Sequence, residues 1–182
     1  MMSRAAFLDL NGTLVTPIIV EKLEDLRIIP GAEQAVAALC RAGFRCPVVT
    51  VQSRIAKGLF SVSQFLEWFH AFAGTMRGYG AHLEGPYVCP HRFATPCACK
   101  KPKTLLYQRA AEECGFQLEG AFVIGDTAAD MQAAKQFRGI GCLVRTGSVE
   151  GGADLARAEA DANYVGRDVA HVVQWILDQP GV

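Results

Sequence analysis

Short apolar segments alternate along this chain with segments of helical periodicity, and this alternation constrains the fold more than any other feature. The segments expected to be strands are 5–10, 46–51, 121–124, 141–144 and 163–165. The segments between them carry apolar residues three and four positions apart, which is typical of helices that cover a sheet. The pattern favours right-handed strand–helix–strand units with a parallel sheet buried on both faces. It therefore predicts an α/β fold, a Rossmann-like three-layer domain around a central parallel sheet.

The length and charge of the chain narrow the class of protein further. A chain of 182 residues suits a single domain spanning 1–182. Eighteen acidic and eighteen basic side chains balance, which argues against a nucleic-acid scaffold. No apolar run approaches the roughly 20 residues that span a bilayer, and the N-terminal apolar stretch is too short for a signal peptide. We therefore expect a cytoplasmic protein that binds neither nucleic acid nor membrane.

Polar side chains lie at the ends of three expected strands, where parallel sheets bind their ligands. Asp9 lies at the end of the first of these strands, Thr50 lies at the end of another, and Gly125-Asp126 follow a third. A lone Asp of this kind would more often close an Asx turn. Two converging carboxylates instead suit Mg²⁺, and a carboxylate at such a turn can attack phosphorus to form an aspartyl-phosphate. The convergence of Asp9 and Asp126 thus favours phosphate chemistry.

Four more polar residues allow both a functional and a structural interpretation. Lys100 and Lys101 lie at the start of an expected helix that opens at Lys101-Pro102, where they can stabilise a transferring phosphate; loop lysines are more often simply solvated. Thr127 and Asp130 have the spacing of a capping box, and the alternative is that Asp130 supports a metal shell. Residues 146–153, with three glycines, are expected to form a mobile connection.

Three of the seven cysteines lie close to a histidine. Cys89-Pro90-His91 is followed after five residues by Cys97-Ala98-Cys99. Three thiolates and one imidazole on a short loop form the ligand set of a closed tetrahedral Zn²⁺ site, which is structural because no coordination position stays open. We therefore expect Zn²⁺ in a loop at about 88–101. The other cysteines, expected to be small core hydrophobes, are Cys40, Cys46, Cys114 and Cys142.

The site residues stand in an order that resembles the haloacid dehalogenase superfamily of phosphatases. The matching motifs are Asp9-Leu10-Asn11-Gly12-Thr13, Thr50, Lys101 and Gly125-Asp126 with Asp130. The resemblance covers about residues 5–147. It is greatest to the small capless members that hydrolyse D-glycero-D-manno-heptose 1,7-bisphosphate and to the related histidinol-phosphate phosphatases. Residues 48–53, 55–58 and 143–147 look like the heptose group, whereas the short cysteine loop is closer to the histidinol-phosphate group.

The resemblance implies a Mg²⁺-dependent phosphatase for a small phosphorylated metabolite, without a large cap domain, that acts as a monomer. Heptose bisphosphate is the first candidate substrate, and histidinol phosphate is the alternative. Asp9 would be the nucleophile, and Asp126 and the backbone of Asn11 would complete the Mg²⁺ site with it. Thr50 and Lys101 would grip the phosphoryl group. The residues expected along the substrate are Gly12, Thr13, Gln52, Ser53, Arg54 and Lys100, with Thr127 and Asp130 in support.

Asn11 departs from the pattern, because these phosphatases normally carry a second Asp there as general acid/base. A carboxamide cannot shuttle protons, and that catalysis typically contributes roughly 10²–10⁴-fold. Three interpretations stay open: a slow phosphatase, an engineered Asp→Asn trap, or a phosphate-binding or regulatory domain that no longer turns over. The other site residues favour the enzyme. Two smaller departures are Arg54, where the heptose group usually has glycine, and Lys100 in place of a substrate-binding arginine.

Overall fold

The computed structural model describes residues 4–147, 153–180 and 182. Its strands are β1 (Arg4–Leu8), β2 (Val15–Thr16), β3 (Arg27–Ile28), β4 (Phe44–Arg45), β5 (Pro47–Val51), β6 (Glu84–Cys89), β7 (Phe122–Gly125), β8 (Ile140–Val144) and β9 (Tyr164–Gly166). Its α-helices are α1 (Ala32–Arg41), α2 (Val62–Gly78), α3 (Leu105–Cys114), α4 (Ala128–Gln136), α5 (Ala153–Asp161) and α6 (Val169–Leu177). Short 3-10 helices cover Leu23–Asp25 and Ile55–Lys57.

The central sheet is parallel throughout, as the alternation of segments predicts. Its strand order is β6-β5-β1-β7-β8-β9, and β4 also pairs with β1. The five expected strands correspond to β1, β5, β7, β8 and β9, and β1 lies between β5 and β7. The segment after β1 also forms a separate antiparallel pair, β2 with β3. The α/β prediction is therefore confirmed, with additional short strands.

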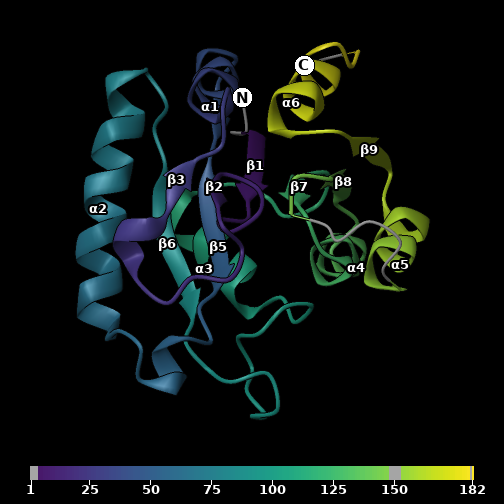
Figure 1. Cartoon of the computed structure of the whole chain (residues 1–182). Helices are drawn as coiled ribbons and strands as arrows, with labels where there is room; N and C mark the ends of the chain where they lie inside the picture. Colours follow the sequence, from purple (N-terminus) through teal and green to yellow (C-terminus); the bar gives the residue numbers. More distant parts are fainter. Residues whose placement is uncertain (1–3, 148–152, 181) are drawn as a thin grey trace.

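Helices cover both faces of the sheet (Figure 1), and the side chains of β1 alternate between the two faces. Ala6 and Leu8 join a core cluster with residues of α1, α2 and α6. Ala5 and Phe7 point to the other face and join residues of α3 and α4. The Phe7 ring meets Tyr107 of α3 edge-on at 4.9 Å between centroids. Helix α5 packs beside α4. Burial of both faces explains why the strands read as continuous apolar runs.

The starts of α2 and α3 are set by different local features. Ser61 and Gln64 form the capping box that opens α2, with hydrogen bonds of 3.1 and 2.8 Å. In contrast, α3 begins at Leu105, so the expected start at Lys101-Pro102 was wrong. The side chain of Lys101 is drawn into the protein by two carboxylates, and the chain turns there before the helix starts. Most of the connection expected at 146–153 lies outside the described residues.

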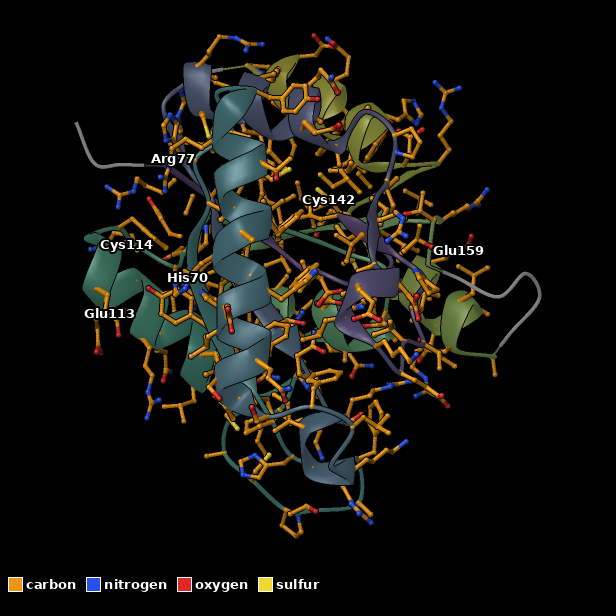
Figure 2. All side chains as sticks on the ribbon, turned by 60° about the vertical axis from the view of Figure 1, so that its left-hand side comes forward. His70, Arg77, Glu113, Cys114, Cys142 and Glu159 are labelled. Atoms are coloured by element: carbon orange, nitrogen blue, oxygen red, sulfur yellow. The ribbon has the colours of Figure 1, made fainter. Side chains whose placement is uncertain are left out.

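Of the four cysteines outside the expected zinc loop, two lie in the core and two lie at the margin of the core. Cys46 and Cys142 are fully buried, as expected, whereas Cys40 and Cys114 are half-buried. Figure 2 places Cys142 in the interior and Cys114 beside Glu113 at the outer end of α3.

None of the described helices is long and apolar enough to span a bilayer.

Candidate active site

The carboxyl ends of β1, β5 and β7 bring three predicted site residues to one cavity. Asp9 follows β1, Thr50 lies near the end of β5, and Asp126 follows β7. These strands are adjacent and parallel, so their ends meet at the same edge of the sheet. All three residues line a cavity of about 470 Å³. The convergence inferred from the sequence is present in the fold.

Lys101 lies between two carboxylates in the wall of this cavity. Its Nζ is 2.7 Å from Asp9 Oδ1 and 2.6 Å from Asp130 Oδ1, and its side chain is only 4% exposed. Burial by itself would lower the pKa of Lys101, but the negative charges of Asp130 and Asp9 hold this pKa well above its ordinary value. Burial in turn raises the pKa of Asp9 to about 6, although Lys101 counteracts part of this effect. The lysine is therefore a fixed positive charge beside Asp9.

Asp126 adds a third carboxylate to this group. Ligand oxygens of Asp9, Asp126 and Asp130 all lie within 4.8 Å of one another. Burial, together with the negative charges of Asp9 and Asp130, raises the pKa of Asp126 to about 9. One lysine faces three carboxylates, so the cluster favours binding of additional positive charge. A set of carboxylate oxygens at this spacing fits Mg²⁺, which prefers hard oxygen ligands.

Two glycines allow the backbone to approach Asp126 closely. A Cβ added to Gly12, where φ is +89°, would lie 2.3 Å from Asp126 Oδ2, and one added to Gly147 would lie 1.9 Å from it. The hydroxyl of Thr146 donates to the Gly12 carbonyl at 2.5 Å and joins the two loops. Gly12 was expected along the substrate, but the structure places it against Asp126 and outside the cavity lining. Its small size is needed for the packing of the carboxylate.

Asp130 forms the capping box that its spacing with Thr127 predicts, and it also contacts Lys101. One of its oxygens accepts hydrogen bonds from the backbone N–H of Thr127 at 3.3 Å and from its hydroxyl at 2.5 Å. The other oxygen binds Lys101. Asp130 therefore stabilises the start of α4 and also positions the lysine beside Asp9.

The side chain of Asn11 is held at the cavity by Gln52. The Nε2 group of Gln52 donates to Asn11 Oδ1 at 2.8 Å and to Thr50 Oγ1 at 3.0 Å. Asn11 Nδ2 lies 3.5 Å from the carbonyl oxygen of Pro17. Because the Gln52 amide donates to Thr50 Oγ1, the proton of that hydroxyl can point elsewhere. The side chain of Asn11 is held at the cavity, but its amide group cannot act as a general acid.

Lys100 lines the cavity, but its ammonium group is turned towards its own loop. Nζ donates to the carbonyl oxygens of Arg92 at 2.5 Å, Phe93 at 2.6 Å and Thr95 at 3.1 Å. These three contacts match the three donors of an ammonium group. In this geometry Lys100 orders the loop that precedes it.

The remaining residues expected along the substrate divide into two groups. Gln52 and Arg54 line the cavity. Thr13 and Ser53 do not line it, and their hydroxyls are buried with no hydrogen-bond partner among the described residues.

Sequence reasoning missed several residues of the cavity wall. Ile18 and Val20 come from the segment between β2 and β3, Phe93 comes from the cysteine loop, and Asp154 comes from the first turn of α5. Phe93 is 74% exposed, and Ile18 is 39% exposed. The apolar residues in otherwise polar loops were the available signal, whereas the position of Asp154 depends on how α5 packs.

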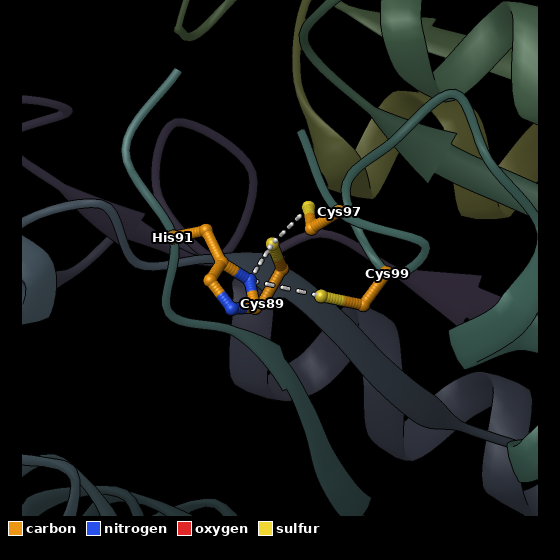
Figure 3. Close-up of side chains that lie close together, drawn as sticks. All are labelled: Cys89, His91, Cys97 and Cys99. Atoms are coloured by element: carbon orange, nitrogen blue, oxygen red, sulfur yellow. Dashed lines mark hydrogen bonds between the residues drawn. The ribbon is translucent and has the colours of Figure 1, made fainter. Parts of the chain in front are cut away.

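The expected zinc ligands form a second cluster (Figure 3), and their loop contributes Phe93 to the cavity wall. Cys89 ends β6, and the other three ligands lie in the following loop. Cys89 Sγ is 3.8 Å from Cys97 Sγ and 3.6 Å from His91 Nδ1, which is 3.3 Å from Cys99 Sγ. A tetrahedral ion with bonds of about 2.3 Å to sulfur and about 2.0 Å to nitrogen would hold sulfurs about 3.8 Å apart and sulfur about 3.5 Å from nitrogen. The four side chains therefore fit Zn²⁺.

Comparisons with known proteins agree with this geometry. A family model described as HAD-hydrolase-like matches residues 98–172. The D-glycero-beta-D-manno-heptose-1,7-bisphosphate 7-phosphatase of Photorhabdus laumondii is 34% identical, over 79% of this chain and 81% of that protein. The enzyme of that name from Vibrio cholerae is 34% identical over 94% and 96% of the two chains. A D,D-heptose 1,7-bisphosphate phosphatase from B. bronchiseptica, complexed with magnesium and phosphate, matches with a TM-score of 0.82 and 26% identity over 96% of this chain and 98% of that chain. This chain therefore belongs to the haloacid dehalogenase-like phosphatases, in the family of the heptose-1,7-bisphosphate 7-phosphatases.

Proposed function

We propose that this protein is a Mg²⁺-dependent phosphatase that hydrolyses D-glycero-D-manno-heptose 1,7-bisphosphate through an aspartyl-phosphate. The observation that carries the proposal is the position of Asp9, whose carboxylate lies in the cavity between Lys101 and the neighbouring carboxylate of Asp126. The similarity to heptose-bisphosphate phosphatases over nearly the full length of both chains supports this substrate over histidinol phosphate.

In the proposed reaction, a carboxylate oxygen of Asp9 attacks phosphorus. The new bond joins that oxygen to phosphorus, the bond between phosphorus and the sugar oxygen breaks, and the sugar oxygen takes a proton as it leaves. Lys101 keeps Asp9 ionised and oriented. The hydroxyl of Thr50, whose oxygen accepts from Gln52, donates its proton to a phosphoryl oxygen. Water then hydrolyses the aspartyl-phosphate.

We propose that Asp9, Asp126 and the backbone carbonyl of Asn11 hold Mg²⁺, with Thr127 and Asp130 supporting the shell from the start of α4. When bound, Mg²⁺ reduces the repulsion between an anionic nucleophile and an anionic substrate. The high pKa of Asp126 supports this assignment, because a nearby cation would favour the ionised form of its carboxyl group.

Asn11 makes this a slow phosphatase for substrates with poor leaving groups. Its amide accepts a hydrogen bond from Gln52 but supplies no proton to the departing sugar oxygen. Solvent must then provide that proton. The two alternatives, an engineered Asp→Asn trap and a phosphate-binding or regulatory domain, share the same cavity and differ only in turnover.

Arg54 is the cation best placed to bind the second phosphate of a bisphosphate. It lines the cavity, and its guanidinium makes no hydrogen bond or ion pair with any described residue. The ammonium of Lys100 is engaged by three carbonyls, and that of Lys101 by two carboxylates. A guanidinium can hold a phosphate group through two parallel hydrogen bonds. Gln52 completes this wall, whereas Gly12, Thr13 and Ser53 do not line the cavity.

We further propose a structural Zn²⁺ bound by Cys89, His91, Cys97 and Cys99. The backbone N–H of Gln52 donates to the Cys89 carbonyl at 2.8 Å, so an ordered zinc loop also positions the adjacent cavity wall. The thiolate ligands require reducing conditions. This requirement supports a cytoplasmic location. We also propose that residues 1–182 form one domain and that the protein acts as a monomer.

Phosphate release is the test of the proposed function. The purified protein should release phosphate from heptose bisphosphate faster than from histidinol phosphate, and only with Mg²⁺. Asp9→Asn should abolish release, whereas Asp178→Asn, the same change at an exposed position, should not. Retained activity in Asp9→Asn would refute the nucleophile. If neither the protein nor Asn11→Asp releases phosphate from either ester, the binding interpretation replaces the enzyme.

A further inference from the structure

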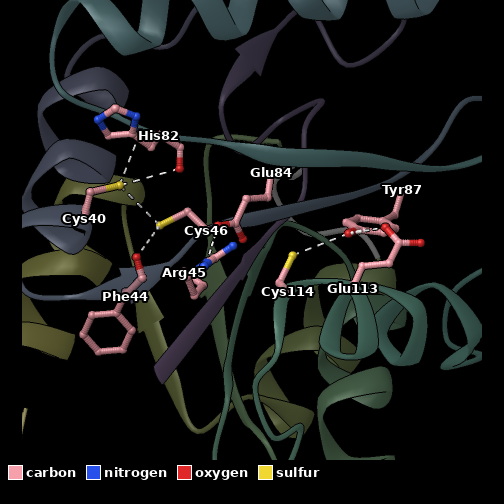
Figure 4. Close-up of polar contacts among 9 residues, drawn as sticks. All are labelled: Cys40, Phe44, Arg45, Cys46, His82, Glu84, Tyr87, Glu113 and Cys114. Atoms are coloured by element: carbon pink, nitrogen blue, oxygen red, sulfur yellow. Dashed lines mark hydrogen bonds and ion pairs between the residues drawn. The ribbon is translucent and has the colours of Figure 1, made fainter. Parts of the chain in front are cut away.

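A pair of thiols lies outside both the cavity and the zinc cluster. Cys40 lies in the last turn of α1, and Cys46 immediately precedes β5, at the opposite end of that strand from Thr50. Their Sγ atoms are 3.8 Å apart, and both cysteines are free (Figure 4). We propose that Cys40 and Cys46 form a redox modification site, at which a hydroperoxide converts the two thiols into an intramolecular disulfide.

The surroundings of Cys40 suit the thiol that the hydroperoxide oxidises first. It is half-buried, and its sulfur accepts the backbone N–H of His82 at 3.3 Å. The hydrogen bond with Cys46, followed by that with the His82 backbone, lowers the pKa of Cys40 to about 6, although burial opposes the change. Glu84 is the nearby group that acts in the opposite direction. A reactive cysteine needs both access and thiolate character.

Cys46 suits the second role, that of the resolving thiol. It is fully buried, and its Sγ lies 3.9 Å from the carbonyl oxygen of Phe44. The hydrogen bond with Cys40 and burial both raise its pKa, so it stays protonated and inaccessible to peroxide. Once Cys40 is oxidised, Cys46 is the cysteine whose sulfur is within reach of it.

The chemistry balances with a hydroperoxide as the oxidant. The Cys40 thiolate attacks a peroxide oxygen, so that an S–O bond forms, the O–O bond breaks, and the leaving oxygen takes a proton. The Cys46 sulfur then attacks the Cys40 sulfenic acid, which forms the S–S bond and releases water with the Cys46 proton. With hydrogen peroxide, two thiols lose two electrons and two waters form. The sulfurs must approach from 3.8 Å to about 2.05 Å, and Cys40 lies in the last turn of α1, close to the start of the short connection that leads to Cys46.

Cys114 provides a matched control in the same region of the fold. It is also half-buried, and Figure 4 shows it beside Tyr87, whose hydroxyl is 3.6 Å from its sulfur. Burial raises the pKa of Cys114, and no described cysteine sulfur is within hydrogen-bond distance of it. Exposure alone would make Cys40 and Cys114 equally sensitive, whereas the proposal separates them.

Peptide mapping of the zinc-loaded full chain tests the site directly. After treatment with hydrogen peroxide and alkylation of the remaining thiols, trypsin cuts after Arg41 and Arg45 and places the two cysteines on separate peptides, 28–41 and 46–54. The expected product is a cross-link between these peptides that disappears on reduction. Cys46→Ala should instead leave a Cys40 sulfenic acid that dimedone labels, and Cys114→Ser should form the cross-link normally.

Two outcomes would overturn the proposal. One is full alkylation of both cysteines in the wild-type protein after a peroxide treatment that oxidises glutathione in the same tube. The other is a cross-link of Cys40 to a cysteine other than Cys46. Because the principal measurement uses the wild-type chain, it does not depend on the folding of any variant.

Discussion

The substitution Asn11→Asp tests the proposed mechanism most directly, because it changes one group of atoms at a position that is already well ordered. Gln52 Nε2, now 2.8 Å from Asn11 Oδ1, can donate to a carboxyl oxygen in the same place. The atom that replaces Nδ2 would lie about 3.5 Å from the Pro17 carbonyl, as Nδ2 does now. Two oxygens at that distance repel unless a proton lies between them. The introduced carboxyl group should therefore have a raised pKa, as a general acid requires.

The expected gain depends on the leaving group. For an alkyl phosphate such as the sugar ester, proton donation contributes roughly 10²–10⁴-fold, equivalent to about 2.7–5.5 kcal/mol at 1.36 kcal/mol per tenfold. The leaving group of an aryl ester such as p-nitrophenyl phosphate departs without a proton, so the rate for this ester should rise less than about tenfold. Steady-state kcat of both proteins for the two esters, measured with saturating Mg²⁺, gives the gain for each ester. Asn163→Asp makes the same chemical change outside the cavity and should alter neither rate.

Equal gains for the two esters would refute the reasoning, because they would show that the carboxyl group acts on charge or metal binding and not as a proton donor. No gain for the alkyl ester would equally refute it. Adding Asp9→Asn to the faster variant should abolish turnover of both esters.

Four further outcomes follow from the geometry. Lys101→Met leaves two buried carboxylates unpaired, so it should lower the free energy of unfolding by about 3–5 kcal/mol in urea titrations; an unchanged midpoint would contradict the ion-pair network. Cys97→Ser should reduce zinc from about one ion per chain to a small fraction by elemental analysis and lower Tm, whereas metal-free wild-type protein would rule out the site. Gly147→Ala forces a methyl group onto the carboxylate of Asp126, a proposed Mg²⁺ ligand, and should raise the Mg²⁺ concentration for half-maximal activity about 10–100-fold, while Gly74→Ala, with open space around it, should not. Arg54→Ala should raise KM for the bisphosphate roughly 10–100-fold and leave KM for a monophosphate nearly unchanged; equal effects would remove Arg54 from recognition of the second phosphate.

Much of the fold was predictable because its signals are local. The capping box of Ser61 and Gln64 marks the start of α2, and an apolar period runs along residues 169–177 of α6. Apolar runs mark the strands because both faces of a parallel sheet are buried. The spacing of the four expected zinc ligands is equally local, since all four lie within eleven residues. The segment between β1 and α1 lacks such a period, and its short β2–β3 pair was missed.

The site itself depends on contacts between segments that are far apart in the chain. The sequence alone indicated that Asp9, Thr50 and Asp126 meet, because parallel strands end at one edge. Only the tertiary structure placed Lys101 between Asp9 and Asp130 and turned the ammonium of Lys100 towards three loop carbonyls. Local patterns determine which residues become helix or strand, but the direction of a long charged side chain is decided by the buried charges and carbonyls it meets after the chain has folded.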